Sequence, residues 1–230
     1  GSLVTSSAVL DGNVTAAEAT ANRAGNVLNL DAGSTLAATG AVLNSQSSSS
    51  EVSASAGSTV SFALTATNAA AASASSVSVR GNRTTAVARG NSASNALNAL
   101  ASAVYAPGAT NGAEATTIDG GPRATATYAV LNSQTNDGNV TASAVASYGV
   151  AFNAVDQAAG SVFGSSVAVS GNRIAADAAG NVASNSIVLN SRPGVMPSAA
   201  VMNIQSNTAA ITATVDEARI GVPAGLPGAI

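Results

Sequence analysis

Apolar and polar residues alternate with a period of two along most of the chain. From Val60 the even positions hold Val, Phe, Leu and Ala, whereas the odd positions hold Ser, Ala and Thr. From Val140 to Phe152 the even positions hold Val, Ala, Tyr and Phe, and most odd positions up to Ser147 hold Ser or Thr. This period puts each set on one face of a strand and predicts half-buried β-strands. The alanine-rich segments 15–23 and 69–76 would suit a helix, but Thr, Ser, Gly and Asn interrupt them too often.

Two phrases recur at long intervals. AVLNSQ begins at Ala41 and again at Ala129, and AVMNIQ begins at Ala200, each followed by an alternating segment. SSVSVRGNR begins at Ser75 and SSVAVSGNR at Ser165. The repeat of about 88 to 90 residues is too long for one short solenoid unit and suits several coils. Segments that share wording are therefore expected to stack on one another as parallel backbone rungs.

Gly-Asn pairs stand at matching places in the repeats and are predicted to be structural corners. Glycine and asparagine tolerate the left-handed backbone that a tight corner requires. Asparagines at equivalent corners can also stack their amides into a hydrogen-bonded ladder. The predicted corner residues are Gly81, Asn82, Gly90, Asn91, Gly171, Asn172, Gly180 and Asn181.

These repeats predict an all-β fold, a β-solenoid (β-helix) of repeated coils with Gly-Asn corners. A single domain is expected over residues 1–220, with long repeats at about 41–128 and 129–199 and partial copies at 7–40 and 200–215. The segment 221–230 is apolar and uncharged. It is expected to be a cap, an arm that docks on the next subunit, or a frayed terminus.

The composition favours a stack of rungs over a compact globule. Hydrophobic residues make up 46% of the chain, yet aromatic residues only 3% and charged residues 8%. Small side chains bury little area each, so the interior must be thin. Disordered chains are usually poor in β-branched residues and rich in charged residues. This chain has the opposite composition on both counts. The net charge of −3 includes no basic stripe, so no nucleic-acid partner is expected.

The phrases GNRTTAVARGNSASNALNAL, GNRIAADAAGNVASNSIVLN and AVLNSQTNDGNVTASA resemble repeats of the holdfast anchor proteins of stalked alphaproteobacteria. More broadly they resemble the repeats of bacterial adhesins and fibre-forming surface proteins. The heads of trimeric autotransporter adhesins are similar, but their Val-Ala-Ile-Gly phrase and heptad stalk are missing here. The resemblance spans roughly residues 7–215 and implies an exported protein of the outer-membrane surface that anchors adhesive polysaccharide.

The sequence contains no recognisable set of catalytic residues. The chain has no histidine, cysteine or lysine, so Ser-His-Asp, Cys-His and Ser-Lys nucleophiles are excluded. The carboxylates are scattered, and the adjacent pair Asp216-Glu217 would face opposite ways in a strand. Asp11-Gly12-Asn13 and Asp137-Gly138-Asn139 could offer oxygen ligands to calcium, but such triplets are common turns. We therefore expect no enzyme, no cofactor and no metal.

Four arginines beside the Gly-Asn pairs are the candidate contacts to an acidic polysaccharide: Arg80, Arg83, Arg89 and Arg173. Solvated corner residues are the competing interpretation, since exposed ion pairs contribute little. The sequence thus predicts an extracellular, self-assembling adhesion protein whose partners are copies of itself, surface polysaccharide or outer-membrane anchor proteins. The alternative is a monomeric carbohydrate- or ice-binding module that uses the rows Thr65-Ala-Thr67, Thr125-Ala-Thr127 and Thr212-Ala-Thr214.

Overall fold

All the regular structure that the computed structural model describes is β-strand. It describes residues 3–4, 6–66, 72–73, 75–104, 113–116, 123–154, 162–163, 166–191 and 197–221. The strands are β1 (Leu3–Val4), β2 (Ser7–Asp11), β3 (Val14–Leu36), β4 (Gly40–Ser48), β5 (Val52–Ala66), β6 (Ala72–Ser73), β7 (Ser76–Arg80), β8 (Arg83–Val104), β9 (Ala113–Thr116), β10 (Arg123–Ala126), β11 (Tyr128–Asn136), β12 (Val140–Ala154), β13 (Val162–Phe163), β14 (Ser166–Ser170), β15 (Arg173–Ser191), β16 (Ala199–Asn207) and β17 (Ile211–Gly221). The prediction of an all-β fold is confirmed.

The long strands form three stacked tiers. The first tier contains β2 to β5, the middle tier β7, β8, β11 and β12, and the third tier β14 to β17. Each strand pairs in parallel with its equivalent in the next tier, giving the sheets β2-β7-β14, β3-β8-β15, β4-β11-β16 and β5-β12-β17. The short strands β1, β6 and β13 form a fifth such sheet.

Repeated wording sets the register between tiers. Ala41, Ala129 and Ala200, which begin the three copies of one phrase, are direct partners. Ser76 and Ser166, from the second phrase, are also partners. The expectation that segments with shared wording stack on one another is confirmed.

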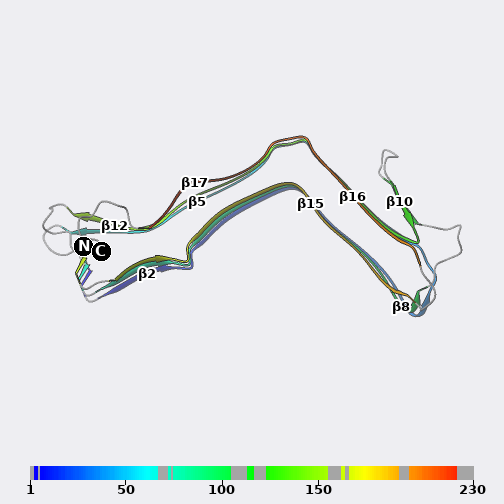
Figure 1. Cartoon of the computed structure of the whole chain (residues 1–230), viewed down its shortest axis with the longest axis horizontal. Helices are drawn as coiled ribbons and strands as arrows, with labels where there is room; N and C mark the ends of the chain where they lie inside the picture. The colour runs from blue at the N-terminus through cyan, green and yellow to red at the C-terminus, as the bar shows by residue number, and fades with distance from the viewer. Residues whose placement is uncertain are drawn as a thin grey trace.

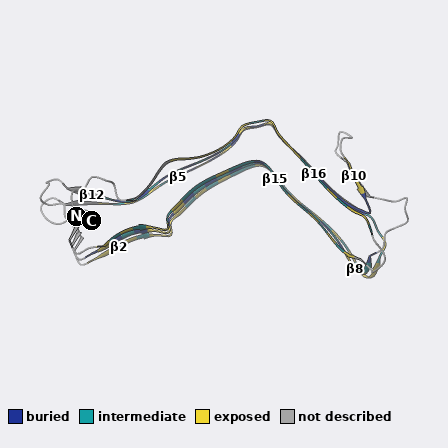
Figure 2. Cartoon of the chain, in the orientation of Figure 1, coloured by how far each residue is buried: buried dark blue, intermediate teal, exposed yellow. Residues whose placement is uncertain are grey.

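Each tier runs out along one long arm and returns along another (Figure 1). We call β2, β3 and their partners the lower arm, and β4, β5 and their partners the upper arm. The tiers superimpose in this view, which looks down the stack. Figure 2 shows buried and exposed residues alternating along both arms, as the period of two predicts.

A thin apolar interior fills the space between the arms. Alanines and valines of β5 and β12 pack against alanines of β8, while Val77 and Val79 of β7 pack against Tyr148 and Val150 of β12. Further along, Leu97 and Ala99 of β8 meet β11. The predicted inward face of β12, at even positions from Val140 to Val150, is at most 1% exposed. Small residues suffice because each has neighbours above, below and across.

The two arms are offset along the stack. Strand β5 packs against both β3 and β8, and β12 packs against both β8 and β15, whereas β17 packs against β15 of its own tier. The lower arm of the first tier and the upper arm of the third tier are therefore the two ends of the stack.

An antiparallel hairpin departs from the repeat. Strands β9 and β10 pair with each other, and Ala124 of β10 packs on the outward face of β11 at Ala129 and Leu131. Only three residues, 37–39, join β3 to β4 in the first tier. The hairpin is therefore an insertion of the middle tier, and β11 is buried on both faces from Tyr128 to Asn132, where Ala124 packs on it.

Candidate functional site

Stacked amides tie the lower-arm strands of the three tiers together. In each ladder the side-chain amide of one asparagine donates to the Oδ1 of the asparagine in the next tier at 2.7–2.8 Å. The three ladders are Asn13–Asn82–Asn172, Asn22–Asn91–Asn181 and Asn26–Asn95–Asn185. Asn82 and Asn172 thus occupy equivalent places, as the stacking of repeats requires.

The upper arm carries further ladders, which the sequence analysis did not identify. Asn44, Asn132 and Asn203 form one, Gln46, Gln134 and Gln205 another. They recur in the phrase AVLNSQ, so the repeated Asn and Gln were the available signal. Buried amides are stable only when hydrogen-bonded, and their matching partners fix the register.

Asn132 joins the two arms. Its side chain is fully buried, accepts from Asn44 at 2.7 Å and Asn95 at 3.3 Å, and donates to Asn203 at 2.7 Å. Asn26 likewise donates to Asn44 across the arms. These contacts make a continuous polar network inside an otherwise apolar interior.

Two of the predicted corners have a left-handed backbone. Gly81 and Gly171 have φ values of +65° and +64°, and Gly12 of the first tier has +68°. Each lies between a short and a long strand of the lower arm. The asparagine that follows starts the first ladder.

The other predicted corners, at Gly90-Asn91 and Gly180-Asn181, are not breaks between strands. They lie inside β8 and β15, and neither glycine is in the left-handed region. Instead the buried positions of β8 change there from even numbers, ending at Gly90, to odd numbers, starting at Asn91. The physical requirement at Gly90 is space, since a Cβ would lie under 3.0 Å from the Gly180 carbonyl and the Asn136 side chain.

In the first tier, different residues occupy the positions equivalent to Gly90 and Asn136. Ala21 stands between Thr20 and Asn22, the partners of Arg89 and Asn91, and thus matches Gly90, while Ser48 pairs with Asn136. A larger residue on the lower arm thus faces a smaller one on the upper arm. An open groove of about 530 Å³, lined by Thr20, Asn22 and residues 47–53, lies at this place.

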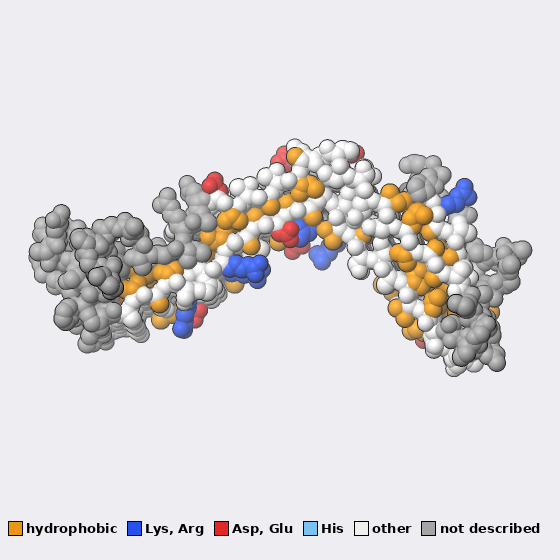
Figure 3. Space-filling model, in the orientation of Figure 1, with side chains coloured by type: hydrophobic (Ala, Val, Ile, Leu, Met, Phe, Trp, Pro, Cys, Tyr) orange, Lys and Arg blue, Asp and Glu red, His pale blue; other side chains and the backbone are white. Residues whose placement is uncertain are grey.

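The third tier leaves its inward apolar residues uncovered. Val201, Ile211 and Val215 are 52%, 44% and 45% exposed, whereas their partners Val130, Val140 and Ala144 in the middle tier are 0% exposed. Their equivalents in the first tier, Val42, Val52 and Ala56, are at most 6% exposed. The exposure follows from the offset of the arms, because none of the described strands lies beyond β17. Figure 3 shows a band of apolar side chains between the arms and charged groups near the outer margins.

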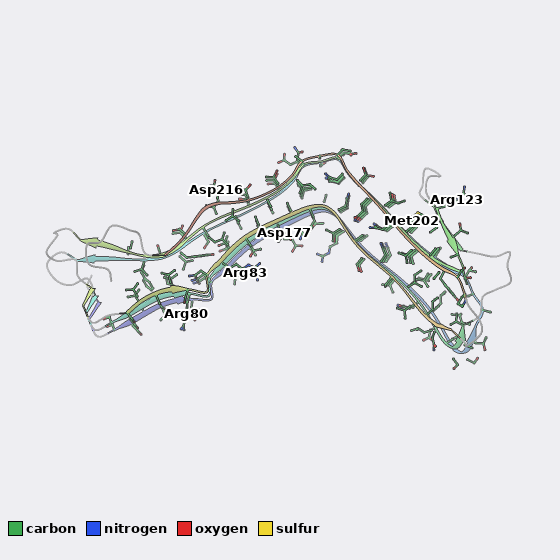
Figure 4. All side chains as sticks on the ribbon, in the orientation of Figure 1. Arg80, Arg83, Arg123, Asp177, Met202 and Asp216 are labelled. Carbon is green, nitrogen blue, oxygen red and sulfur yellow. The ribbon has the colours of Figure 1, made fainter. Side chains whose placement is uncertain are left out.

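The four candidate arginines fall into two groups. Arg80 pairs with Asp11 at 3.0 Å, and Arg89 pairs with Asp177. Arg83 and Arg173 are register partners on adjacent tiers, and neither makes an ion pair within the described part of the chain. Arg83 instead donates from Nε to Thr85 at 2.9 Å. Figure 4 shows Arg80, Arg83 and Asp177 along the lower arm.

Replacing Asp177 by asparagine should cost stability at neutral pH but not in acid. A hydrogen bond from Arg89 lowers the pKa of Asp177; burial opposes this shift, and the positive charge of Arg89 adds to it. A lowered folded-state pKa means that the ionised carboxylate stabilises the fold at neutral pH and that this gain is lost as pH falls through that pKa. The pair is exposed, so we expect about 0.2–1 kcal/mol. Urea unfolding of both proteins at neutral and acid pH tests this; an equal difference at both pH values would contradict it.

The remaining sequence candidates lie apart from one another. Asp11 is engaged by Arg80, and Asp137 accepts from Thr208 at 2.6 Å. Among the described residues, no three acidic groups converge on a possible metal site. Thr212 and Thr214 are exposed and stack on Thr141 and Ser143. Thr125 lies in β10, while Thr67 and residues 222–230 of the predicted tail are outside the described residues.

The part of the chain described here contains no helix that could span a membrane. Comparison with protein-family models, with curated proteins and with solved structures returns no match to this chain.

Proposed function

We propose that this chain is a non-enzymatic structural protein, a three-tier β-solenoid that self-assembles into fibres. The observation that carries the proposal is the exposed inward face of the third tier, at Val201, Ile211 and Val215, whose partners in the tiers below are buried. Monomeric proteins rarely leave core-forming positions open, and such surfaces usually mark an association site.

The backbone supports the same proposal. Among the described strands, those at the two ends of the stack have a parallel neighbour on one side only, so their outer edges present N–H and C=O groups. Such edges recruit further strands unless charge, proline or a covering element blocks them. The bulge in β17 between Asp216 and Arg219 disturbs one stretch of an edge, but β15 keeps the register of β8 over most of its length.

The repeated sequence phrases support a proposal for where the fibre is located and what it does. Their resemblance to holdfast anchor and adhesin repeats supports a place on the bacterial cell surface, where the fibre would anchor an adhesive polysaccharide or outer-membrane partner. Arg83 and Arg173 support contact with an acidic polysaccharide, since like charges directly opposite one another are unfavourable. A carboxylate or sulfate bound between them would relieve this repulsion.

A second candidate function is a monomeric carbohydrate- or ice-binding module. It is favoured by the outward face of β5, β12 and β17, where Ser53, Thr141 and Thr212 stack next to Ser55, Ser143 and Thr214. The hydroxyls form two rows across three tiers. Thermal hysteresis or glycan binding by a non-assembling sample would favour this module over the fibre.

The fibre proposal predicts that purified protein forms unbranched filaments as its concentration rises. Electron microscopy and sedimentation over a range of concentration and pH provide the measurement, with strand-spacing diffraction near about 4.8 Å along the filament. Dispersed monomers at every concentration and pH would contradict self-assembly.

A further inference from the structure

We propose that the third tier of one copy stacks directly on the first tier of the next, in the register that already joins the tiers within a chain. This inference rests on the proposed assembly and specifies its joint. In it, β15 pairs with β3 of the next copy, and β16 and β17 pair with β4 and β5. The occupant of the open third-tier face is thus a second copy of this chain.

The sequence spacing of equivalent residues is the same in the first tier and in the third tier. On the lower arm, Asn13, Asn22 and Asn26 are nine and four residues apart, and so are Asn172, Asn181 and Asn185. On the upper arm, Asn44, Gln46 and Val52 are two and six residues apart, as are Asn203, Gln205 and Ile211. A second copy can therefore continue the asparagine and glutamine ladders, and place Val52 opposite Ile211, in one register.

The three lower-arm ladders that begin at Asn13, Asn22 and Asn26 share one direction. In them each asparagine donates to its counterpart in the next tier toward the third, and none of the described groups donates to the Oδ1 of Asn13, Asn22 or Asn26. The exposed pair on the same arm has the opposite direction, since Asn98 donates to Asn29 of the first tier. Acceptors thus face outward at the first tier, opposite amide groups at the third. Parallel strands impose the same direction, because two third-tier ends turned face to face would run antiparallel. Head-to-tail contacts of this kind form open filaments.

Apolar packing across the joint repeats the packing inside the chain. Val140 lies between β8 and β15, against Ala86, Ala88 and Ile174. Ile211 and Val215 have β15 on one side only. In the joint, Ala17 and Ala19 of the next copy, which pack in their own chain with Val52 and Ala54, would cover the other side.

One contact opposes the joint. Glu18 and Asp177 both have Val87 as register partner, so Glu18 of the next copy lies opposite Asp177. Each carboxylate has its own cation, Arg23 for Glu18 and Arg89 for Asp177. The repulsion is therefore between two paired, exposed charges, and such interactions are weak.

Cysteine pairing tests the register, because the chain contains no native cysteine. Gly25 and Ser184 are both exposed partners of Ser94, and a Cβ on Gly25 meets nothing within 4 Å. Within one chain they are two tiers apart, about 9–10 Å, which is too far for a disulfide. In the joint they become direct neighbours.

We expect Gly25→Cys and Ser184→Cys proteins, assembled together and oxidised, to form mixed disulfides, while neither forms them alone. Gly25→Cys/Ser94→Cys is the geometric control, since these residues are neighbours inside one chain. Disulfides between identical variants, or filaments without the mixed disulfide, would overturn the joint while leaving the fibre proposal intact. Absence of any filament would overturn the fibre proposal itself.

A pair of charge substitutions provides a second readout. Val215 and Thr214 are adjacent and both exposed, but Val215 faces inward and Thr214 outward. Val215→Lys should raise the protein concentration needed for filaments about ten-fold or more, because the joint would bury an unpaired charge. Thr214→Lys should leave that concentration unchanged. Equal effects of the two substitutions would also overturn the joint.

Discussion

Replacing Asn132 by alanine is expected to lower the free energy of unfolding by about 2–6 kcal/mol. The side chain is fully buried and accepts hydrogen bonds from Asn44 and Asn95, which are themselves at most 5% exposed. Its removal leaves one N–H of each of these two buried amides without an acceptor, although Asn95 keeps its bond to Asn185, and each such group costs about 1–3 kcal/mol. Chemical denaturation monitored by circular dichroism measures the change.

Asn98→Ala is the matched control for this substitution. Asn98 also belongs to a ladder and donates to Asn29 at 2.8 Å, but that bond is exposed to solvent. Water replaces the lost partner there, so we expect a loss of about 1 kcal/mol or less. Similar losses for the two variants would show that the interior network contributes no more than a surface ladder.

Gly90→Ala is expected to destabilise the protein by about 3 kcal/mol. The added Cβ would lie under 3.0 Å from both the Gly180 carbonyl oxygen and the Asn136 side chain. The carbonyl is backbone of the adjacent tier and cannot move without separating paired strands. Overpacking of this kind commonly costs 1–3 kcal/mol. Thermal and urea unfolding are the measurements.

Gly57→Ala is the matched control, because Gly57 is an exposed strand residue with nothing within 4 Å of an added Cβ. It should be neutral or slightly stabilising, since glycine weakens a strand. Adding Asn136→Ser to Gly90→Ala should recover part of the loss by imitating Ala21 and Ser48 of the first tier. A Gly90→Ala protein as stable as the Gly57→Ala protein would contradict the close approach of the tiers.

The fold could be predicted from the sequence wherever the same short sequence recurs in successive tiers. The copies beginning at Ala41, Ala129 and Ala200 stack in register because identical side chains satisfy one another across tiers. The inward face of β12 followed from a period of two, since each strand has one face against the opposite arm. Both features depend on local sequence or on the repeat itself.

The remaining features depend on packing between segments that share no wording. The change of buried face at Gly90-Asn91 occurs where the lower arm meets the upper-arm corner near Asn136, and the alternating pattern alone does not show it. Among the described residues the hairpin β9–β10 occurs in the middle tier alone, so no second copy of its sequence indicated it. Asn132 was part of a recognised phrase, but its burial depends on how the two arms face each other.

The hairpin β9–β10 has a consequence for any filament built from this chain. Only the middle tier carries this projection in the described residues, so a head-to-tail filament would bear one knob per molecule along a single side. Three strand spacings amount to about 14 Å. Such a filament would therefore give an axial reflection near that longer spacing in addition to the one from the strands, and its surface would present evenly spaced protrusions to whatever it touches.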